Sequence, residues 1–258
     1  SAHENFQPGD TVVGMGGWQT YSVVDANEPG AIRKVSTSHV PASAYLGPVG
    51  MPGVTGWMGL TQICKPKAGE TLVVSAASGA VGSVVGQLGK SMGCRVVGIA
   101  GGAEKCRYVT QDLGFDACID YKAHADSKSL YGALKAATPD GVDAYLENVG
   151  GIIMDTVLAR TNPFARIAVC GLIAGYDGAP LPMNNATLIL VNRLTIQGFI
   201  VSERMDLWPE ALKTLGEQVA KGKLVYRETI TEGLANAPEA FLGLLKGHNF
   251  GKQLVKLI

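Results

Sequence analysis

The stretch Leu72-Val73-Val74-Ser75-Ala76-Ala77-Ser78-Gly79-Ala80-Val81-Gly82-Ser83-Val84-Val85-Gly86 decides the fold class. It predicts an apolar strand, a glycine-rich turn and the start of a helix. The turn has the form AxGxxGxxxG, a variant of the dinucleotide-binding fingerprint. In that motif Gly79 lets the backbone approach a pyrophosphate, and Gly82 lets the helix pack closely on the strand. Such a loop alone is weak evidence for dinucleotide binding, so the interpretation depends on the secondary structure predicted around it.

Apolar runs and amphipathic helical stretches alternate from residue 71 onward. This alternation predicts an α/β fold of the Rossmann type, a doubly wound parallel sheet of six strands with right-handed crossovers. The loop lies near the start of this unit, which favours dinucleotide binding over a purely structural glycine turn. The predicted strands are 72–76, 95–100, 117–120, 142–147, 166–170 and 195–199. The predicted helices are 81–92, 104–113, 128–138, 152–158, 186–193 and 208–221.

The segments that flank this unit are expected to add small pieces of sheet. Short β-like runs occur at 11–13, 21–24 and 32–35, separated by Gly, Pro and Asp, and they hold too few apolar residues for a core of their own. The tail predicts a helix near 238–245 and a last strand at 253–258. These changes of pattern divide the chain into residues 1–50, 51–225 and 226–258.

The composition excludes several classes of function. Lys plus Arg and Asp plus Glu number 22 each, so no net field draws the chain to nucleic acid or to an anionic membrane. The five cysteines are widely spaced without a CxxC pair, which predicts reduced core thiols. No stretch is long enough without charge or proline to span a bilayer, and residues 1–10 lack an apolar signal core. We therefore expect a cytoplasmic protein.

The end of the second predicted strand indicates which dinucleotide is bound. An Asp or Glu there would bond to the ribose 2′-hydroxyl of NAD and repel a 2′-phosphate. This chain has Ala100-Gly101-Gly102-Ala103 instead, and Lys105 follows in the first turn of the next helix. A lysine bonded to the phosphate would contribute about 1.5 to 3 kcal/mol, roughly tenfold to a hundredfold in affinity. The sequence thus predicts NADPH, and a solvated surface lysine is the alternative.

Five ordered motifs resemble those of the medium-chain dehydrogenase/reductase superfamily. The motifs are MPGVTG at 51–56, SAASGAVG at 75–82, ENVGG at 147–151, CGLIAGY at 170–176 and GHNFGK at 247–252. The chain is most similar to the zinc-independent branch of prostaglandin reductases, alkenal double-bond reductases and curcumin reductases, over essentially its whole length. This resemblance implies an NADPH-dependent oxidoreductase that reduces the C=C bond of α,β-unsaturated ketones or aldehydes by hydride transfer to the β carbon.

The resemblance also implies the residues of the site. The implied cofactor-binding residues are Gly79, Ala80, Val81, Gly82, Lys105, Tyr121, Asn148, Cys170, Gly171, Tyr176, Phe199, Ile200, Val201, Asn249 and Thr55. Gly79 to Gly82 would hold the pyrophosphate, and Lys105 with Tyr121 the 2′-phosphate side. Tyr176 is also the catalytic candidate, which would polarise the substrate carbonyl or relay a proton. Ordinary roles as cap, turn, core or groove-lining residues remain the alternatives.

A partial second domain follows from the same resemblance. Residues 1–50 and 226–258 would be the remnant of a GroES-like β-barrel catalytic domain, N-terminally truncated, and the superfamily implies a homodimer. The chain departs from its relatives at Gly102, where a serine is frequent, and at Asp177, where an asparagine is frequent.

Two other functions remain open. The chain could be an NADPH quinone reductase, or a non-catalytic NADPH-binding module because the truncation removes much of the substrate cleft. No metal is expected, because residues 51–56 contain no cysteine and the four histidines show no ligand spacing. Tyr131 and Lys135 have the YxxxK spacing of short-chain dehydrogenases, but they lie too close to the glycine loop for that role.

Overall fold

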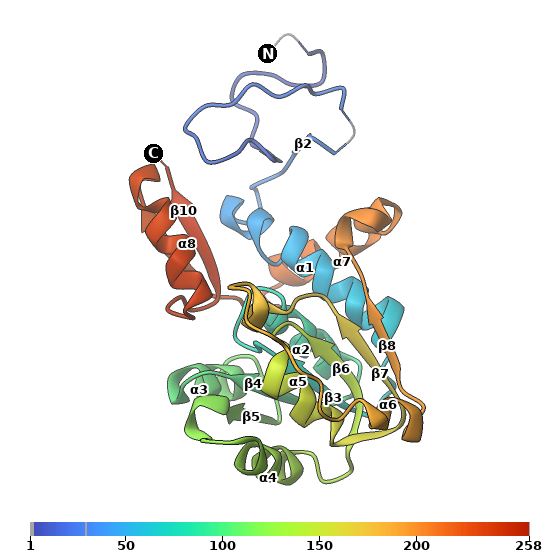
Figure 1. Cartoon of the computed structure of the whole chain (residues 1–258). Coiled ribbons are helices and arrows are strands. Elements are labelled where there is room, and N and C mark those ends of the chain that lie inside the picture. Colours follow the sequence, from blue (N-terminus) through green and yellow to red (C-terminus); the bar gives the residue numbers. More distant parts are fainter. Residues whose placement is uncertain (1–2, 29, 258) are drawn as a thin grey trace.

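A six-stranded parallel sheet forms the centre of the molecule (Figure 1). The computed structural model describes residues 3–28 and 30–257. The strand order is β5-β4-β3-β6-β7-β8, and every neighbouring pair is parallel. The strands are β3 (Thr71–Ser75), β4 (Arg95–Ala100), β5 (Ala117–Asp120), β6 (Val142–Glu147), β7 (Thr161–Val169) and β8 (Thr195–Gly198). The predicted doubly wound sheet is therefore confirmed, and the strand order reverses between β3 and β6.

Helices cover both faces of the sheet because successive strand residues point to opposite sides. Leu72 and Val74 face one hydrophobic cluster, whereas Val73 faces the other. The helices of the first face are α1 (Met51–Met58), α2 (Gly82–Ser91), α3 (Ala103–Gln111) and α7 (Trp208–Ala220). Those of the second face are α4 (Ser127–Ala137) and α5 (Gly151–Leu158), and the short helix α6 (Thr187–Val191) precedes β8.

Several boundaries differ from the sequence prediction. Strand β3 ends at Ser75 rather than Ala76, because Ala76 has a φ of 48° in the left-handed region. Helix α1 and the π-helix that continues it (Gly59–Cys64) were not predicted, since three glycines and a proline obscure the helical pattern. The 3-10 helices are Ala42–Leu46, Tyr121–Ala123, Ile173–Gly175, Val201–Leu207 and Leu234–Asn236.

Two small sheets lie outside the six-stranded one. Strand β1 (Val12–Gly14) is antiparallel to β2 (Ile32–Lys34), and β9 (Glu228–Glu232) is parallel to β10 (Lys252–Lys256), with α8 (Ala237–Leu245) between them. The predicted strand at 21–24 is wrong: Tyr21 and Val23 are almost fully exposed, so no partner strand or core covers them. Strand β9 was missed because it contains a single apolar residue.

The predicted last strand extended to residue 258, which lies outside the described residues. In Figure 1 the N-terminal segment and the β9-α8-β10 unit lie to one side of the central sheet. Within the residues that the structure describes, no helix is both long and apolar enough to cross a bilayer.

Candidate cofactor site

The carboxyl ends of β3 and β6 meet at the point where the strand order reverses. Ser75 ends β3 and Glu147 ends β6. In open parallel sheets the crevice outside such a switch point is the usual ligand site. Asn148 lies there beside β3, because its backbone N–H donates to Ser75 Oγ at 2.8 Å and its Nδ2 donates to Ser75 O at 2.9 Å. The sheet thus brings together the glycine loop, which follows β3, and the turn at residues 148–151, which follows β6.

The glycine loop closes tightly between β3 and α2. The N–H of Gly79 donates to Ala76 O at 2.9 Å, and a Cβ at Gly82 would lie 2.5 Å from that same oxygen. Only glycine therefore fits at Gly82. Among the described residues no group accepts the backbone N–H of Ala80, Val81 or Gly82, and no side chain caps α2. Free donors at the positive end of a helix fit an anion such as a pyrophosphate.

A buried glutamate holds the turn that follows β6. The Glu147 carboxylate accepts hydrogen bonds from Ser75 Oγ and the Gly150 N–H, both at 2.9 Å, and from the Val149 N–H and the Tyr145 hydroxyl. Burial raises the pKa of Glu147, although these four bonds act in the opposite direction. A buried acidic group is tolerated when its hydrogen bonds are satisfied in this way.

The sequence prediction missed Glu147 and Ser75 as parts of this site. The available signal was a carboxylate that ends an otherwise apolar strand, Val142 to Glu147, in which every residue but Asp143 is buried. A buried charged residue needs partners, but the sequence does not say which residues supply them.

The predicted residues Asn148, Cys170, Gly171 and Tyr176 lie together at this edge. The Cys170 thiol donates to Asn148 Oδ1 at 3.0 Å, and the Cβ position of Gly171 lies 3.4 Å from the Tyr176 hydroxyl. Asn148 is not a helix cap, since α5 follows Gly150 without a side-chain cap. Tyr176 is 63% exposed, and its hydroxyl has no hydrogen-bond partner among the described residues. It is available to a bound molecule.

The ends of β4 and β5 form a second, basic part of the site. The Gly102 N–H donates to Asp120 Oδ1 at 2.7 Å, which turns this carboxylate toward the backbone. A Cβ at Gly101 would lie 2.9 Å from the Tyr121 ring and 3.0 Å from Lys122 Cε. The packing therefore brings Tyr121 and Lys122 against the turn after β4.

Lys105 belongs to the same region. Burial and the neighbouring charge of Lys122 lower the pKa of Lys105, and its Nζ donates to Gly247 O at 2.8 Å. Lys105 is thus not simply a solvated surface residue. Lys122 was not predicted; its only signal in the sequence is its position directly after Tyr121.

The remaining predicted residues make local contacts. Thr55 Oγ1 donates to Met51 O at 2.8 Å within α1, and Asn249 Nδ2 donates to Gly251 O at 2.8 Å. Phe199 packs against the first hydrophobic cluster, Ile200 is exposed, and Val201 O accepts a bond from Trp208 Nε1 at 3.1 Å. None of these bonds joins them to residues 79–82.

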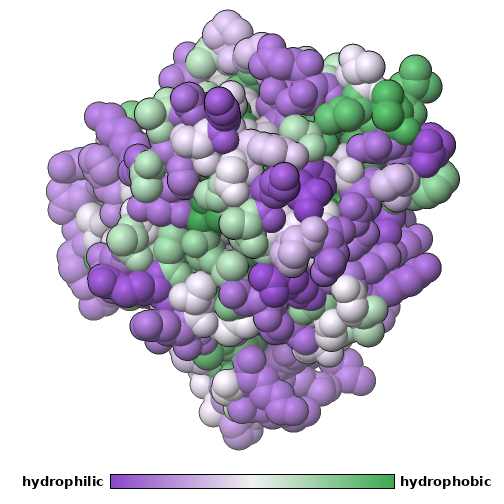
Figure 2. Space-filling model, turned by 90° about the horizontal axis from the view of Figure 1, so that it is seen from below, coloured by the Kyte–Doolittle hydropathy of each residue, from purple (hydrophilic) through white to green (hydrophobic). Residues whose placement is uncertain are grey.

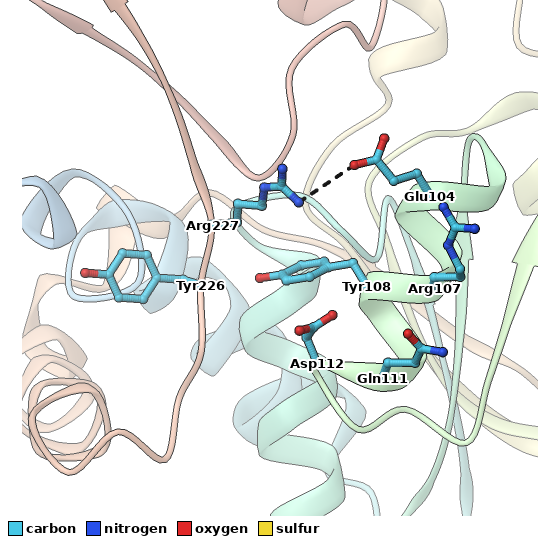
Figure 3. Close-up of a pocket in the computed structure, with 7 residues that line it drawn as sticks. All are labelled: Glu104, Arg107, Tyr108, Gln111, Asp112, Tyr226 and Arg227. Atoms are coloured by element: carbon cyan, nitrogen blue, oxygen red, sulfur yellow. Dashed lines mark ion pairs between the residues drawn. The ribbon is translucent and has the colours of Figure 1, made fainter.

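A separate cavity of about 380 Å³ lies between α3 and residues 226–227 (Figure 3). Arg227 reaches across it, 3.9 Å from Glu104, and its guanidinium stacks on Phe250. The Tyr108 hydroxyl is buried and has no hydrogen-bond partner in the described part of the chain. The cavity is lined by Glu104, Arg107, Tyr108, Gln111, Asp112, Tyr226 and Arg227, so no residue of the glycine loop borders it.

The fold and the loop together define a dinucleotide-binding protein of the Rossmann type. The family described as zinc-binding dehydrogenase matches residues 80–217. The NADPH-dependent curcumin reductase of Escherichia coli (strain K12) is 46% identical over the full length of this chain and 74% of its own. The NADP(+)-dependent 2-alkenal reductase of Nicotiana tabacum is 43% identical over 99% of this chain and 73% of its own.

A solved structure gives the same result. The crystal structure of CurA in complex with NADPH from Vibrio vulnificus has a TM-score of 0.85 and 45% identity, over 94% of this chain and 72% of that one. The chain therefore belongs to the zinc-binding dehydrogenase family, in the branch of the medium-chain dehydrogenases/reductases that contains the curcumin, alkenal and prostaglandin reductases.

The family description names zinc, but the residues described here do not fit that metal. No group of three or more His, Cys, Asp or Glu side chains among them is arranged to hold a metal ion. A zinc site needs such converging ligands.

Proposed function

We propose that this chain binds NADPH along the carboxyl edge of its sheet and reduces C=C bonds conjugated to a carbonyl in ketones or aldehydes. The observation on which the proposal rests is the arrangement at the switch point: Ser75, which directly precedes the glycine loop with its free N–H donors, bonds to Asn148, and Asn148 bonds to Cys170. The names of the curcumin, alkenal, prostaglandin and pulegone reductases among its relatives support the reaction class.

The binding roles follow from these positions. Gly79, Ala80, Val81 and Gly82 would hold the pyrophosphate on the free donors of α2. Lys105, Tyr121 and Lys122 would surround the 2′-phosphate, because Tyr121 and Lys122 pack against the turn after β4 and Lys122 acts electrostatically on Lys105. Asn148, Cys170, Gly171 and Tyr176 would border the nicotinamide half. The residues proposed to complete the groove are Thr55, Phe199, Ile200, Val201 and Asn249.

Bound NADPH would supply the hydride that the β carbon of the substrate accepts. The role of the protein is then to orient the substrate and to manage one proton. The exposed Tyr176 hydroxyl can donate a hydrogen bond to the substrate carbonyl oxygen, where negative charge develops, or relay a proton to the α carbon. A positioned acid of this kind contributes roughly 10² to 10⁴ in rate.

The direct test measures NADPH consumption by the purified chain with methyl vinyl ketone, beside NADH and beside menadione as a quinone acceptor. We expect turnover with NADPH and the enone. Faster turnover with menadione would favour the quinone reductase, and tight NADPH binding without turnover would favour a non-catalytic module. Tyr176→Phe should lower kcat with little change in NADPH affinity, whereas an unchanged kcat would leave Tyr176 a groove-lining residue.

The domain organisation belongs to the same proposal. Residues 51–225 would form the NADPH-binding domain, and residues 1–50 and 226–258 would belong to a GroES-like catalytic domain. The positions of the two small sheets outside the central one support this division. Limited proteolysis should cut first within the exposed residues 17–23 and beside the exposed Val225, since residues 47–50 are buried.

We also propose a homodimer joined at the edge strand β8. Among the described strands, β8 pairs only with β7, and Leu190 and Val191 beside it are 80% and 54% exposed. Figure 2 shows a largely hydrophilic face with a hydrophobic group at its upper right, the side on which α6 lies in Figure 1. Unpaired edges and apolar patches favour association. Light scattering should give a dimer, and Leu190→Lys should weaken it.

The five free cysteines support a cytoplasmic location, where thiols remain reduced.

A further inference from the structure

Two of the five free cysteines lie in direct contact. Cys106 on α3 and Cys118 on β5 are 3.2 Å apart between their sulfur atoms, and the Cys118 thiol donates to Cys106 Sγ. The thiols of the other cysteines donate elsewhere: Cys64 to Tyr145 O, Cys94 to Lys67 O and Cys170 to Asn148 Oδ1. Within the described residues this is the only contact between two thiols.

The contact gives the two thiols different pKa values. The hydrogen bond from Cys118 lowers the pKa of Cys106, against the effects of burial and the charge of Asp120. The same bond and burial raise the pKa of Cys118. Burial raises the pKa of both Cys64 and Cys170 to about 12. Because the thiolate is the reactive form, Cys106 is the cysteine best suited to react first.

We propose that Cys106 and Cys118 form a redox-sensitive pair that hydroperoxides convert into a disulfide. The Cys106 thiolate attacks a peroxide oxygen, the O–O bond breaks, and Cys106 becomes a sulfenic acid. Cys118 then loses its proton and attacks that sulfur, and hydroxide leaves and is protonated. In total, two thiols and one hydrogen peroxide give one disulfide and two waters. A disulfide is about 2 Å long, so the sulfur atoms must approach by about 1 Å.

This closure would move the turn that follows β4. The Cys106 N–H donates to Gly102 O at 3.1 Å, and the Gly102 N–H donates to Asp120, two residues after Cys118. Lys105 directly precedes Cys106 in α3. Drawing α3 and β5 together therefore shifts the basic part of the site. This consequence rests on the proposed function, in which that part holds the 2′-phosphate.

The first experiment titrates the purified chain with hydrogen peroxide, counts thiols in the unfolded protein with Ellman's reagent and maps disulfide-linked peptides by mass spectrometry. We expect two of the five thiols to be lost together, in one Cys106–Cys118 peptide, and restored by dithiothreitol. Cys118→Ser should prevent the disulfide and leave a trappable sulfenic acid at Cys106, whereas Cys94→Ser should retain the pair. Retention of all thiols, or earlier loss of Cys64, Cys94 or Cys170, would overturn the proposal.

The second experiment compares NADPH and NADH affinities of reduced and oxidised protein by fluorescence titration. We expect oxidation to lower the NADPH-to-NADH affinity ratio about tenfold, the equivalent of one hydrogen bond to a charged group. The double variant Cys106→Ser/Cys118→Ser should keep its ratio under peroxide. An unchanged ratio in the oxidised wild-type chain would overturn the inference that the disulfide shifts the basic part of the site. Absence of NADPH binding in the reduced chain would instead contradict the proposed function, and the thiol count would still test the pair.

Discussion

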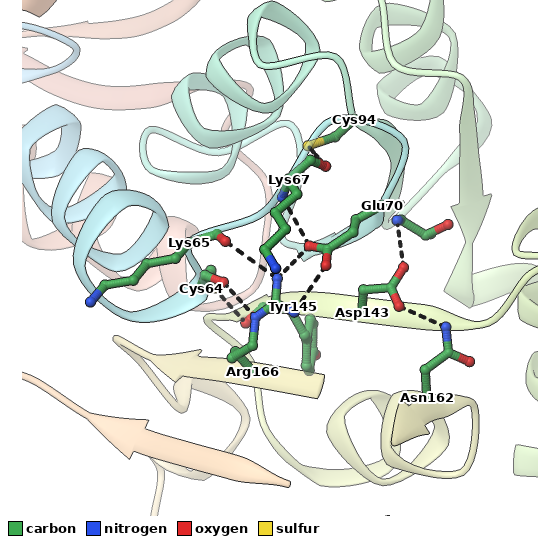
Figure 4. A network of polar contacts seen from close by, with 10 residues as sticks. Cys64, Lys65, Lys67, Glu70, Cys94, Asp143, Tyr145, Asn162 and Arg166 are labelled. Atoms are coloured by element: carbon green, nitrogen blue, oxygen red, sulfur yellow. Dashed lines mark hydrogen bonds and ion pairs between the residues drawn. The ribbon is translucent and has the colours of Figure 1, made fainter. Parts of the chain in front are cut away.

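The two edges of the parallel sheet both contain a buried or half-buried network of charged and polar residues, but they differ in what is left unsatisfied. At the amino edge (Figure 4), Arg166 forms an ion pair with Glu70 and donates to Cys64 O at 2.8 Å. Asp143 accepts the Thr71 N–H at 2.9 Å and a bond from the Asn162 side chain at 2.8 Å. These groups satisfy one another and tie the strand starts together.

The carboxyl edge contains a comparable network around Glu147, but it borders groups without partners. The loop N–H groups of Ala80 to Gly82 and the Tyr176 hydroxyl have no acceptor or donor in the described part of the chain. Buried polar residues therefore do not identify the site by themselves, because both edges have them. The site is identified instead by free N–H donors at the positive end of a helix.

The strongest test of this comparison is Gly82→Ala. The new Cβ would meet Ala76 O at 2.5 Å, so the loop must open and more than one N–H donor is lost. Because each bond to a charged group contributes about 1.5 to 3 kcal/mol, we expect NADPH affinity to fall by more than roughly a hundredfold in calorimetry. Gly132→Ala on α4 is the matched control, since nothing lies within 4 Å of its Cβ position. Normal NADPH binding by Gly82→Ala would refute the loop as the pyrophosphate site.

The second test sharpens the assignment of the basic part of the site. Lys105→Ala removes one cation, and we expect a loss of roughly tenfold to a hundredfold in NADPH affinity with unchanged NADH affinity. Lys135→Ala on the exposed side of α4 should change neither. Equal losses for NADPH and NADH would show that Lys105 acts on the fold rather than on the 2′-phosphate.

The third test compares one glutamate from each edge. Glu70→Gln and Glu147→Gln each disturb bonds to a carboxylate, and each should lower the free energy of unfolding in urea by about 1 to 3 kcal/mol. Only Glu147→Gln should also weaken NADPH binding, because Glu147 holds the turn beside Asn148. If Glu70→Gln weakened binding equally, the two edges would not be functionally distinct.

The smallest expected effect is on the pH dependence of stability, and it has opposite signs for the two glutamates. Burial opposes ionisation of Glu70, but the bonds from Arg166 and the Lys67 N–H prevail and lower its pKa below 4.5. The stability that Glu70 adds to the folded state is therefore fully present above pH 4.5, and it is lost as the pH falls through the lowered pKa. Glu147 has a raised pKa, so its contribution is present below 4.5 and is lost as pH rises through the raised value.

Urea unfolding of the wild-type chain and of both Gln variants from below pH 4.5 to neutral pH measures this difference. The stability gap between wild type and Glu70→Gln should narrow toward acidic pH, and the gap for Glu147→Gln should narrow toward neutral pH. Gaps that change in the same direction would contradict the assigned pKa shifts.

Much of the fold was predictable because its signals are local. The apolar runs of β3, β4 and β6, the amphipathic helices between the strands and the glycine loop each lie within a few consecutive residues. The predictions were wrong or incomplete where structure depends on pairing: the run at 21–24 has no partner strand, and β9 forms beside β10 despite its polar sequence. Strand formation of this kind is decided by neighbours rather than by propensity.

The sequence by itself determined the α/β class, the glycine turn and the absence of an acid after the second strand. These features depend on residue type and short spacing. Only the tertiary structure decided that Glu147 bonds to Ser75, 72 residues earlier, that Lys122 joins Lys105, and that Cys106 meets Cys118. These contacts join different elements of the structure: the first arises because the sheet aligns the ends of β3 and β6, and the other two because α3 packs against β5 and the turn that follows it.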